Sequence, residues 1–335
     1  MNGHEVSVFF DMRAPDFGTP VPELYSAMLE MSAFADEIGV SRIGVMEHHG
    51  SEDGYLPAPF VLAGAVAART SQARLSISAV ILPLHDPVHL AEQIAVLDIV
   101  SNGRLDVVFA AGYVPYEFQM FNVSLRDRGK LMNEGTDIIM RALRGERFTA
   151  GDREIFVRPL PIQAPEDIVI LGGGVEASAR RAARVGGGFA PLRTDLFAVY
   201  DAECAKLGRK PGRKFGGGNG PMSIHVTEDP DRAWEQLTPH VIHVCKAYAA
   251  WAGEEENSNS PFLGLDNEEA VRASGMFACW TPDEVIERAP GIIAGYGGMN
   301  FMPLLGGLSP DIGWESLELL KSKVIPRLKP LLEAN

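Results

Sequence analysis

Short apolar or β-branched runs alternate with longer segments of helical periodicity along most of this chain. Runs of about four to eight apolar residues between turn residues are typical of buried strands, and apolar positions that repeat every three or four residues are typical of helices. The pattern predicts strands at 5–10, 41–46, 74–82, 104–111, 167–171, 187–192, 220–228 and 297–305. The helices predicted after them span 21–39, 57–70, 87–101, 128–144, 176–185, 195–207, 229–251 and 314–332.

This strand-helix repetition predicts an α/β fold with a parallel sheet. Eight such units that close on each other form a (β/α)8 TIM barrel, and we expect one such domain over residues 1–335. Two segments interrupt the rhythm: 145–167 reads as a hairpin after the fourth helix, and 252–284 is a long, acidic, Asn- and Ser-rich excursion before the last strand. Both are expected to be insertions, and the second is either a lid or a solvated surface loop.

Composition narrows the class of protein. The formal net charge of -14 disfavours a nucleic-acid partner, because no basic stripe is present to bind a phosphate backbone. The three cysteines, Cys204, Cys245 and Cys279, are far apart and odd in number, so they indicate neither a disulfide framework nor a CxxC site. The N-terminus lacks a signal-peptide pattern and no run is long enough to span a membrane. We therefore expect a cytoplasmic protein.

Three ionisable residues follow the second predicted strand: Glu47, His48 and His49. In a barrel of this kind the active site lies at the C-terminal ends of the strands, so these side chains are expected at its mouth. Histidine donates and accepts protons near neutral pH, and a carboxylate beside it can orient it. A metal site is disfavoured, since neighbouring residues diverge on a strand and no HExxH motif occurs.

A glycine-rich loop follows the fifth predicted strand. Gly172, Gly173 and Gly174 allow backbone N–H groups to approach an anion, and the helix that follows, with Ser178 in its first turn, offers a positive dipole end. A tight structural turn is the alternative interpretation. The glycine-rich loop is a late βα loop of the predicted barrel, and this position favours a phosphate-binding site over a structural turn.

The residue types that are absent from the predicted mouth exclude several classes of barrel enzyme. No lysine stands at the end of a predicted strand, so a Schiff-base aldolase has no nucleophile in place, and no GxSxG motif occurs. A phosphate-binding barrel isomerase is also disfavoured, because the sequence places no group of general-base residues around the glycine-rich loop. A phosphate cradle with one well-placed histidine and no covalent nucleophile indicates that a cofactor carries out the difficult chemistry.

The segment 47–113 resembles the bacterial luciferase-like flavin monooxygenases, in which an EHH after the second strand, a Pro-started helix, a V-LP---PV strand end and an LD--S-GR helix end recur in this order. The resemblance continues through 121–135 and 281–288 and is looser from 187 to 280. It implies a TIM-barrel fold and a reaction of reduced FMN with O₂ on a small organic substrate.

The resemblance implies a role for individual residues. His48 is the implied catalytic acid or base near the flavin, with Glu47 and His49 beside it. A non-prolyl cis peptide is implied at Ser78 and Ala79, under the flavin ring. The implied cofactor-binding residues are Glu47, Ser78, Ala79, Gly112, Gly172, Gly173, Gly174, Val175 and Ser178. The expected substrate-contacting residues, Met12, His49, Tyr113 and Phe301, favour a largely apolar molecule.

Two positions depart from the family pattern. Ala111 stands where the family commonly has an arginine or a similar polar residue before the glycine that ends strand four, and His89 replaces a frequent arginine after PV. Phosphate binding would then depend on backbone N–H groups, Ser178 and Arg128. This favours transient binding of reduced FMN supplied by a partner reductase, or the deazaflavin F420 instead.

The resulting hypothesis is a flavin-dependent monooxygenase that uses reduced FMN and O₂, with His48 managing proton transfer and the 252–284 excursion closing to exclude water. Two alternatives stay open: an F420-dependent hydride-transfer oxidoreductase, and a non-catalytic flavin-binding protein. The family also implies a homodimer.

Overall fold

The computed structural model of the chain describes residues 6–216, 220–253, 260–296 and 298–328. The chain divides into two compact units, which are described separately. Unit 1 comprises residues 1–57 and 218–335, and unit 2 comprises residues 58–217.

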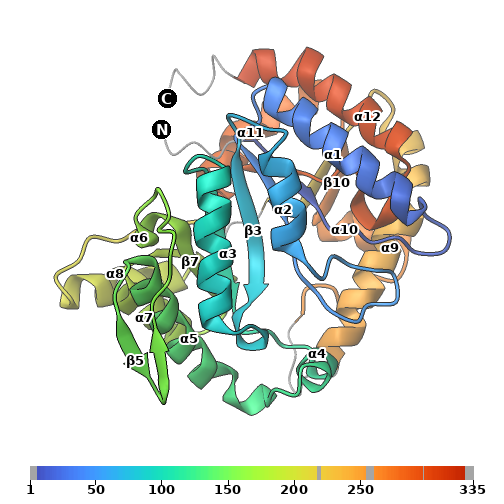
Figure 1. Cartoon of the computed structure of the whole chain (residues 1–335). Coiled ribbons are helices and arrows are strands. Elements are labelled where there is room, and N and C mark those ends of the chain that lie inside the picture. The colour runs from blue at the N-terminus through green and yellow to red at the C-terminus, as the bar shows by residue number, and fades with distance from the viewer. Residues whose placement is uncertain (1–5, 217–219, 254–259, 297, 329–335) are drawn as a thin grey trace. The chain divides into compact units, whose positions relative to one another are not determined.

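The described residues of unit 1 form five parallel strands in the order β10-β9-β11-β1-β2. They are β1 (Val6–Phe10), β2 (Arg42–Val45), β9 (Ser223–Val226), β10 (Phe277–Trp280) and β11 (Met299–Phe301). Its helices are α1 (Val21–Glu37), α9 (Pro230–Gly253), α10 (Glu268–Ser274), α11 (Pro282–Tyr296) and α12 (Pro310–Leu319), and a π-helical turn (Leu320–Val324) continues α12. The helices α1 and α12 lie side by side although they come from opposite ends of the chain (Figure 1).

Helix α1 illustrates how the pattern of apolar residues produces this packing. Leu24, Met28, Met31 and Ala35 repeat every three or four residues and are all completely buried. Such spacing places the four side chains on one face of a helix. The face buries against the rest of unit 1, so helix and sheet share one core.

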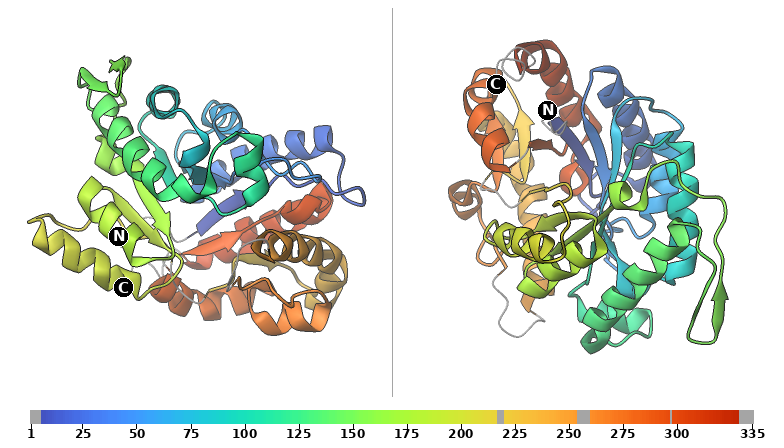
Figure 2. Two further views of the ribbon diagram at one scale, coloured as in Figure 1. Left: turned by 90° about the horizontal axis from the view of Figure 1, so that it is seen from below. Right: turned by 90° about the vertical axis from the view of Figure 1, so that its left-hand side faces the viewer.

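Unit 2 contains four parallel strands in the order β3-β4-β7-β8. They are β3 (Arg74–Ile81), β4 (Leu105–Ala110), β7 (Val169–Gly173) and β8 (Gly188–Pro191). Its helices are α2 (Pro59–Ala67), α3 (Pro87–Val100), α4 (Pro115–Met120), α5 (Arg128–Leu143), α6 (Pro165–Ile168), α7 (Glu176–Val185) and α8 (Leu196–Lys206). An antiparallel hairpin, β5 (Phe148–Ala150) and β6 (Arg153–Ile155), follows α5 and projects from unit 2 (Figure 2).

Two residues of the LD--S-GR segment hold unit 2 together. The carboxylate of Asp98, which is fully buried, accepts hydrogen bonds from the backbone N–H groups of Ile162 and Gln163 at 2.7 and 2.9 Å. Arg104 donates to the carbonyl oxygens of Thr70 at 2.9 Å and Ser101 at 2.7 Å, just beyond the ends of α2 and α3. Ser101 is the C-cap of α3, and the end of a helix leaves such carbonyl groups without intrahelical partners. The segment therefore has a structural purpose.

The predicted α/β class is confirmed, and so is the hairpin within 145–167. The prediction of a loop-like excursion over 252–284 was wrong in part, because it contains α10 and the strand β10. The four residues of β10 pair with β9, and so short a run after an acidic segment gave no clear periodic signal. Residues 254–259 of the excursion lie outside the described residues, and the last helix begins at Pro310 rather than at 314.

None of the described helices combines the length and the apolar character that crossing a bilayer requires.

Candidate active site

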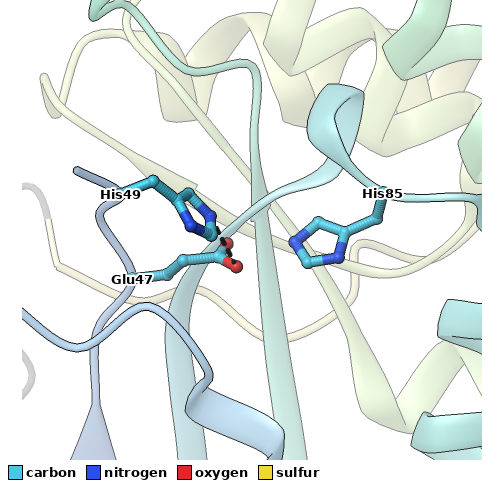
Figure 3. Close-up of side chains that lie close together, drawn as sticks. All are labelled: Glu47, His49 and His85. Carbon is cyan, nitrogen blue, oxygen red and sulfur yellow. Dashed lines mark ion pairs between the residues drawn. The ribbon is translucent and has the colours of Figure 1, made fainter. Parts of the chain in front are cut away.

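Of the three ionisable residues after β2, Glu47 and His49 contact each other, whereas His48 contacts other side chains. Glu47 and His49 turn toward each other, with 3.3 Å between Oε1 of Glu47 and Nε2 of His49 (Figure 3). His48 contacts aromatic side chains instead: its ring stacks on Trp251 at a centroid distance of 4.4 Å and meets the edge of Tyr55 at 4.8 Å. All three residues of the EHH segment are buried. The structure thus gives His48 different surroundings from its two neighbours.

A completely buried arginine lies among the same aromatic rings. Arg13, three residues beyond β1, donates from Nη1 to Oδ2 of Asp53 at 2.5 Å. Its guanidinium carbon lies 4.4 Å from the ring centre of Tyr55, 5.2 Å from that of Tyr248 and 4.9 Å from that of Trp251. These are cation–π distances, and such contacts are stronger where water is excluded. The rings that surround Arg13 therefore include the one stacked on His48.

Asp53 is the acidic centre of this group. Besides Arg13, its carboxylate contacts Nε2 of His243 at 2.7 Å and accepts a hydrogen bond from the hydroxyl of Ser51 at 2.5 Å. Burial alone would raise the pKa of Asp53, but the His243 hydrogen bond and the Arg13 charge outweigh it and hold that pKa well below its usual range. Asp53 is thus a permanent carboxylate at neutral pH.

Asp11, directly after β1, has the opposite electrostatic character. Burial raises the pKa of its carboxyl to about 6, although the charge of Arg13 and the N–H groups of Gly306 and Arg13 act against that shift. Oδ2 of Asp11 accepts from the N–H of Gly306 at 3.1 Å. Asp11 therefore changes charge close to neutral pH, next to a group of permanently charged residues.

The predicted substrate-contacting residues of unit 1 lie in its interior. Met12 is 1% exposed and has a φ of 61°, in the left-handed region. Phe301, on β11, is 2% exposed and pairs in register with Val8 of β1. Their contact with substrate stays a prediction.

In unit 2 the glycine-rich loop joins β7 to α7. Val175 is the N-cap of α7, and no side chain caps the backbone N–H groups of the first turn among the described residues. Gly173 has a φ of 149°, and a Cβ there would lie 2.5 Å from Cβ of Ser178, so only glycine fits. The hydroxyl of Ser178 donates to the carbonyl of Val175 at 2.6 Å. The backbone N–H of Ser178 donates to the same carbonyl at 3.0 Å, so the N–H groups of Glu176 and Ala177 are the ones suited to an anion.

The neighbouring strands of unit 2 end beside this loop. A cis peptide joins Ser78 and Ala79 in β3, as the resemblance implied. Gly112, after β4, has a φ of 71°, and its carbonyl accepts from Nη1 of Arg128 at 3.0 Å. Tyr113 follows and is half-buried. Because β4 pairs with both β3 and β7, Gly112 and the glycine-rich loop follow the C-terminal ends of neighbouring strands, whereas Ser78 lies within β3, in register with Val108 of β4.

The two departures from the family pattern have different outcomes. Arg128, at the start of α5, reaches the end of β4 next to Ala111, where the family commonly places an arginine. His89 lies on the exposed face of α3, with its ring near Glu92 at 3.8 Å and Gln93 at 3.0 Å. Arg128 therefore places a cation beside Ala111, and His89 is a surface residue.

Sequence reasoning missed most of the group around Arg13. Arg13, Asp53 and Tyr55 stand in the loops after the first and second predicted strands and belong to no motif of their own. His243, Tyr248 and Trp251 are separated from them by about 190 residues. The available signal was periodic: His243, Tyr248 and Trp251 fall on one face of a helix with 3.6 residues per turn.

The sequence profile of the family described as luciferase-like monooxygenase matches residues 5–291. A 4-hydroxyprotoasukamycin monooxygenase of Streptomyces nodosus subsp. asukaensis is 24% identical over 85% of this chain and 89% of its own length. The oxygenase component of the flavin-dependent trigonelline monooxygenase of Acinetobacter baylyi is 29% identical over 48% of this chain. The chain spans 46% of that relative and 38% of another curated relative, an uncharacterized Sinorhizobium fredii protein.

Solved structures of similar fold include the monooxygenase RslO1 of Streptomyces bottropensis, with a TM-score of 0.80 and 23% identity over 97% of this chain and 99% of that one. The oxygenating constituent of 3,6-diketocamphane monooxygenase from Pseudomonas putida, in complex with FMN, has a TM-score of 0.67 and 18% identity over 97% and 98%. An F420-dependent secondary alcohol dehydrogenase in complex with an F420-acetone adduct has a TM-score of 0.66 and 14% identity over 97% and 99%. At these identities the likeness concerns the fold, which is the one predicted. Since the family profile covers well over half of the chain, this protein belongs to the luciferase-like monooxygenase family.

Proposed function

We propose that this protein is the oxygenase of a two-component system, which uses reduced FMN and O₂ to oxidise a small, largely apolar organic molecule. The uncapped N-terminus of α7 behind three glycines is the observation that supports this proposal most directly. Family membership supports the reaction class, and the A. baylyi relative, named an oxygenase component, supports a separate flavin reductase as partner.

The residues of unit 2 fit the phosphate of a flavin mononucleotide. Glycines at 172–174 let the loop backbone pack closely against its neighbours where a side chain would collide, and the first turn of α7 supplies N–H donors with the positive end of the helix dipole. Arg128 adds a cation at the end of the neighbouring strand β4. We assign phosphate binding to this loop and to Arg128. When bound, reduced flavin supplies the electrons that activate O₂.

In unit 1 we assign proton transfer to His48. Its imidazole is the ring of the EHH segment that faces aromatic side chains, whereas His49 and Glu47 contact each other. The apolar surroundings from Tyr55 and Trp251 exclude water from one face of the ring, which protects a reactive site from side reactions. Glu47 and His49 orient the segment that carries His48. Met12, Tyr113 and Phe301 are assigned to an apolar substrate.

The loop is tested with Val175→Asp, which separates folding from binding. Aspartate is a strong N-cap and is expected to stabilise α7 by about 1 kcal/mol, but its carboxylate occupies the place proposed for the flavin phosphate. Val175→Asn is the matched neutral cap. We expect Val175→Asp to weaken binding of reduced FMN at least tenfold in anaerobic fluorescence titrations, while Val175→Asn has a smaller effect. Equal affinities of the two variants would contradict the assignment.

The same titration with F420 decides between cofactors. Binding of reduced FMN but not of F420 supports the monooxygenase, and preferential binding of F420 would replace it with a hydride-transfer oxidoreductase. Oxygen consumption that depends on substrate rules out a purely flavin-binding protein.

The role of His48 is tested by stopped-flow oxidation of reduced FMN in aerated buffer between pH 6 and 9. His48→Gln is expected to change both the rate and its pH dependence, because the amide cannot transfer a proton in this range. His89→Gln, on the exposed face of α3, is the control. Identical pH profiles for wild type and His48→Gln would remove His48 from the proton chemistry.

A further inference from the structure

A hollow lined by arginines lies in unit 2, away from the glycine-rich loop. It has a volume of about 490 Å³ and is bounded by the middle and C-terminal parts of α5 and the last turns of α7. These two helices lie side by side (Figure 1). Four arginines line the hollow: Arg144 directly after α5, Arg181 and Arg184 from α7, and Arg209 beyond α8. We call it the arginine groove.

The positive charge of the arginine groove is poorly compensated. Arg144 pairs with Glu166, and the lining carboxylate, Asp137, lies 3.6 Å from Arg141 outside the groove. Within the described part of the chain, neither Arg181 nor Arg184 forms an ion pair with a carboxylate. This surplus is unusual for a chain with a formal net charge of -14.

Arg181 is the least exposed of these cations, and two hydrogen bonds hold its side chain. Its Nε donates to Oδ1 of Asn133 at 2.7 Å and its Nη2 donates to the carbonyl of Gly129 at 3.3 Å. Both partners are neutral, so the side chain is held in place while its charge stays uncompensated. Burial lowers the pKa of Arg181, and the charge of Arg184 lowers it further. An anion bound beside both guanidinium groups would favour the charged form of Arg181 and so oppose this lowering of its pKa.

The C-terminal end of α7 would by itself oppose an anion, since its carbonyl groups carry partial negative charge. Arg209 offsets much of this partial negative charge. Its Nη1 donates to the carbonyls of Arg184 at 2.5 Å and Ala183 at 3.4 Å. Arg209 thus neutralises the helix end, and the unused N–H donors of Arg181 and Arg184 are left for a ligand.

We propose that the arginine groove binds a small, multiply charged phosphate ligand of the diphosphate class. Guanidinium groups bind phosphate oxygens in a planar, two-pronged geometry, and several of them facing one hollow favour an anion with more than one charge. The volume is in the range of small-ligand sites, roughly 300 to 1,000 Å³, so a nucleoside attached to the diphosphate also fits. This site is separate from the proposed flavin loop and does not depend on it.

The test is isothermal titration calorimetry with sodium pyrophosphate and with ADP, at an ionic strength held constant with NaCl. Arg184→Gln and Arg181→Gln are the groove variants. Arg180→Gln is the matched control, because Arg180 is on the same helix but pairs with Glu176 outside the groove, at 2.6 Å. All titrations are repeated in the Val175→Asp background, which blocks the proposed phosphate site of the flavin loop.

We expect submillimolar binding of pyrophosphate that each groove variant weakens about fivefold or more and that Arg180→Gln changes less than twofold. Val175→Asp should leave this binding intact. Stronger binding of ADP than of pyrophosphate identifies a nucleotide as the ligand. No binding beyond that of matched salt, equal weakening by Arg180→Gln, or loss only in the Val175→Asp background would each overturn the proposal. Arg184→Gln keeps the test independent of folding, because Arg184 is exposed.

Discussion

Replacing Asp53 by asparagine removes the only charge that pairs with the buried guanidinium of Arg13 among the described residues. The side chains of Arg13 and Asp53 are 0% and 5% exposed, so water cannot take over the role of the carboxylate. Breaking a buried ion pair by removing one partner costs about 3–5 kcal/mol. The amide oxygen of asparagine can still accept one hydrogen bond, and the three rings around Arg13 continue to stabilise its charge. We therefore expect a loss of about 3 kcal/mol in the free energy of unfolding.

The assay is urea unfolding at pH 7, followed by tryptophan fluorescence and circular dichroism to check that both report one transition. Asp86→Asn is the matched control: Asp86 pairs with Arg153 at 2.7 Å, but both side chains are about half exposed. Asparagine also preserves the N-cap that Asp86 provides for α3. The control should lose less than about 1 kcal/mol. Equal losses in the two variants would refute the argument from burial.

A double-mutant cycle sharpens this result. Arg13→Met replaces the guanidinium by an apolar side chain of similar length and leaves Asp53 as the unpaired group. If the two charges compensate each other, Arg13→Met with Asp53→Asn should be more stable than the sum of the single effects predicts. Strict additivity would show that Arg13 and Asp53 are not coupled.

Three other predictions follow from single residues. The folded-state pKa of Asp11, about 6, lies above its ordinary 3.8, so its contribution to stability is present at low pH and is lost as pH rises through 6. The free energy of unfolding of Asp11→Asn, measured with urea, should therefore exceed that of wild type by up to about 3 kcal/mol at pH 7.5 and by much less at pH 4.5. In Gly112→Ala the new Cβ would lie 2.6 Å from Cγ2 of Ile81 at a φ of 71°, so the melting temperature should fall clearly more than in Gly151→Ala, which has a φ of 63° but open space; similar shifts would exclude the steric cause. Arg104→Met should cost about 2–4 kcal/mol because it leaves carbonyl groups after α2 and α3 unpaired, and a loss below 1 kcal/mol would contradict the capping role.

Much of the fold could be predicted from the sequence, because strand and helix periodicities are local. The bounds predicted for α7 and the extent of α5 agree closely with the structure, and the hairpin after α5 was expected from its polar turn. The strand β10 was missed because its four residues form a strand by pairing with β9, about fifty residues earlier in the chain. Pairing of this kind leaves little trace in a short apolar run.

The features of the candidate site likewise fall into those that a local sequence pattern identifies and those that depend on the folded structure. The sequence by itself determined the EHH segment, the glycine loop and the family, since each is a contiguous pattern with its own chemistry. Only the tertiary structure decided that His48 stacks on Trp251 while His49 meets Glu47, and that Arg13 is buried against Asp53. These contacts join residues as many as about 200 positions apart, and their energies depend on burial. Burial is a property of the folded chain, so a local pattern such as the helical spacing of His243, Tyr248 and Trp251 can mark candidate residues but not their contacts.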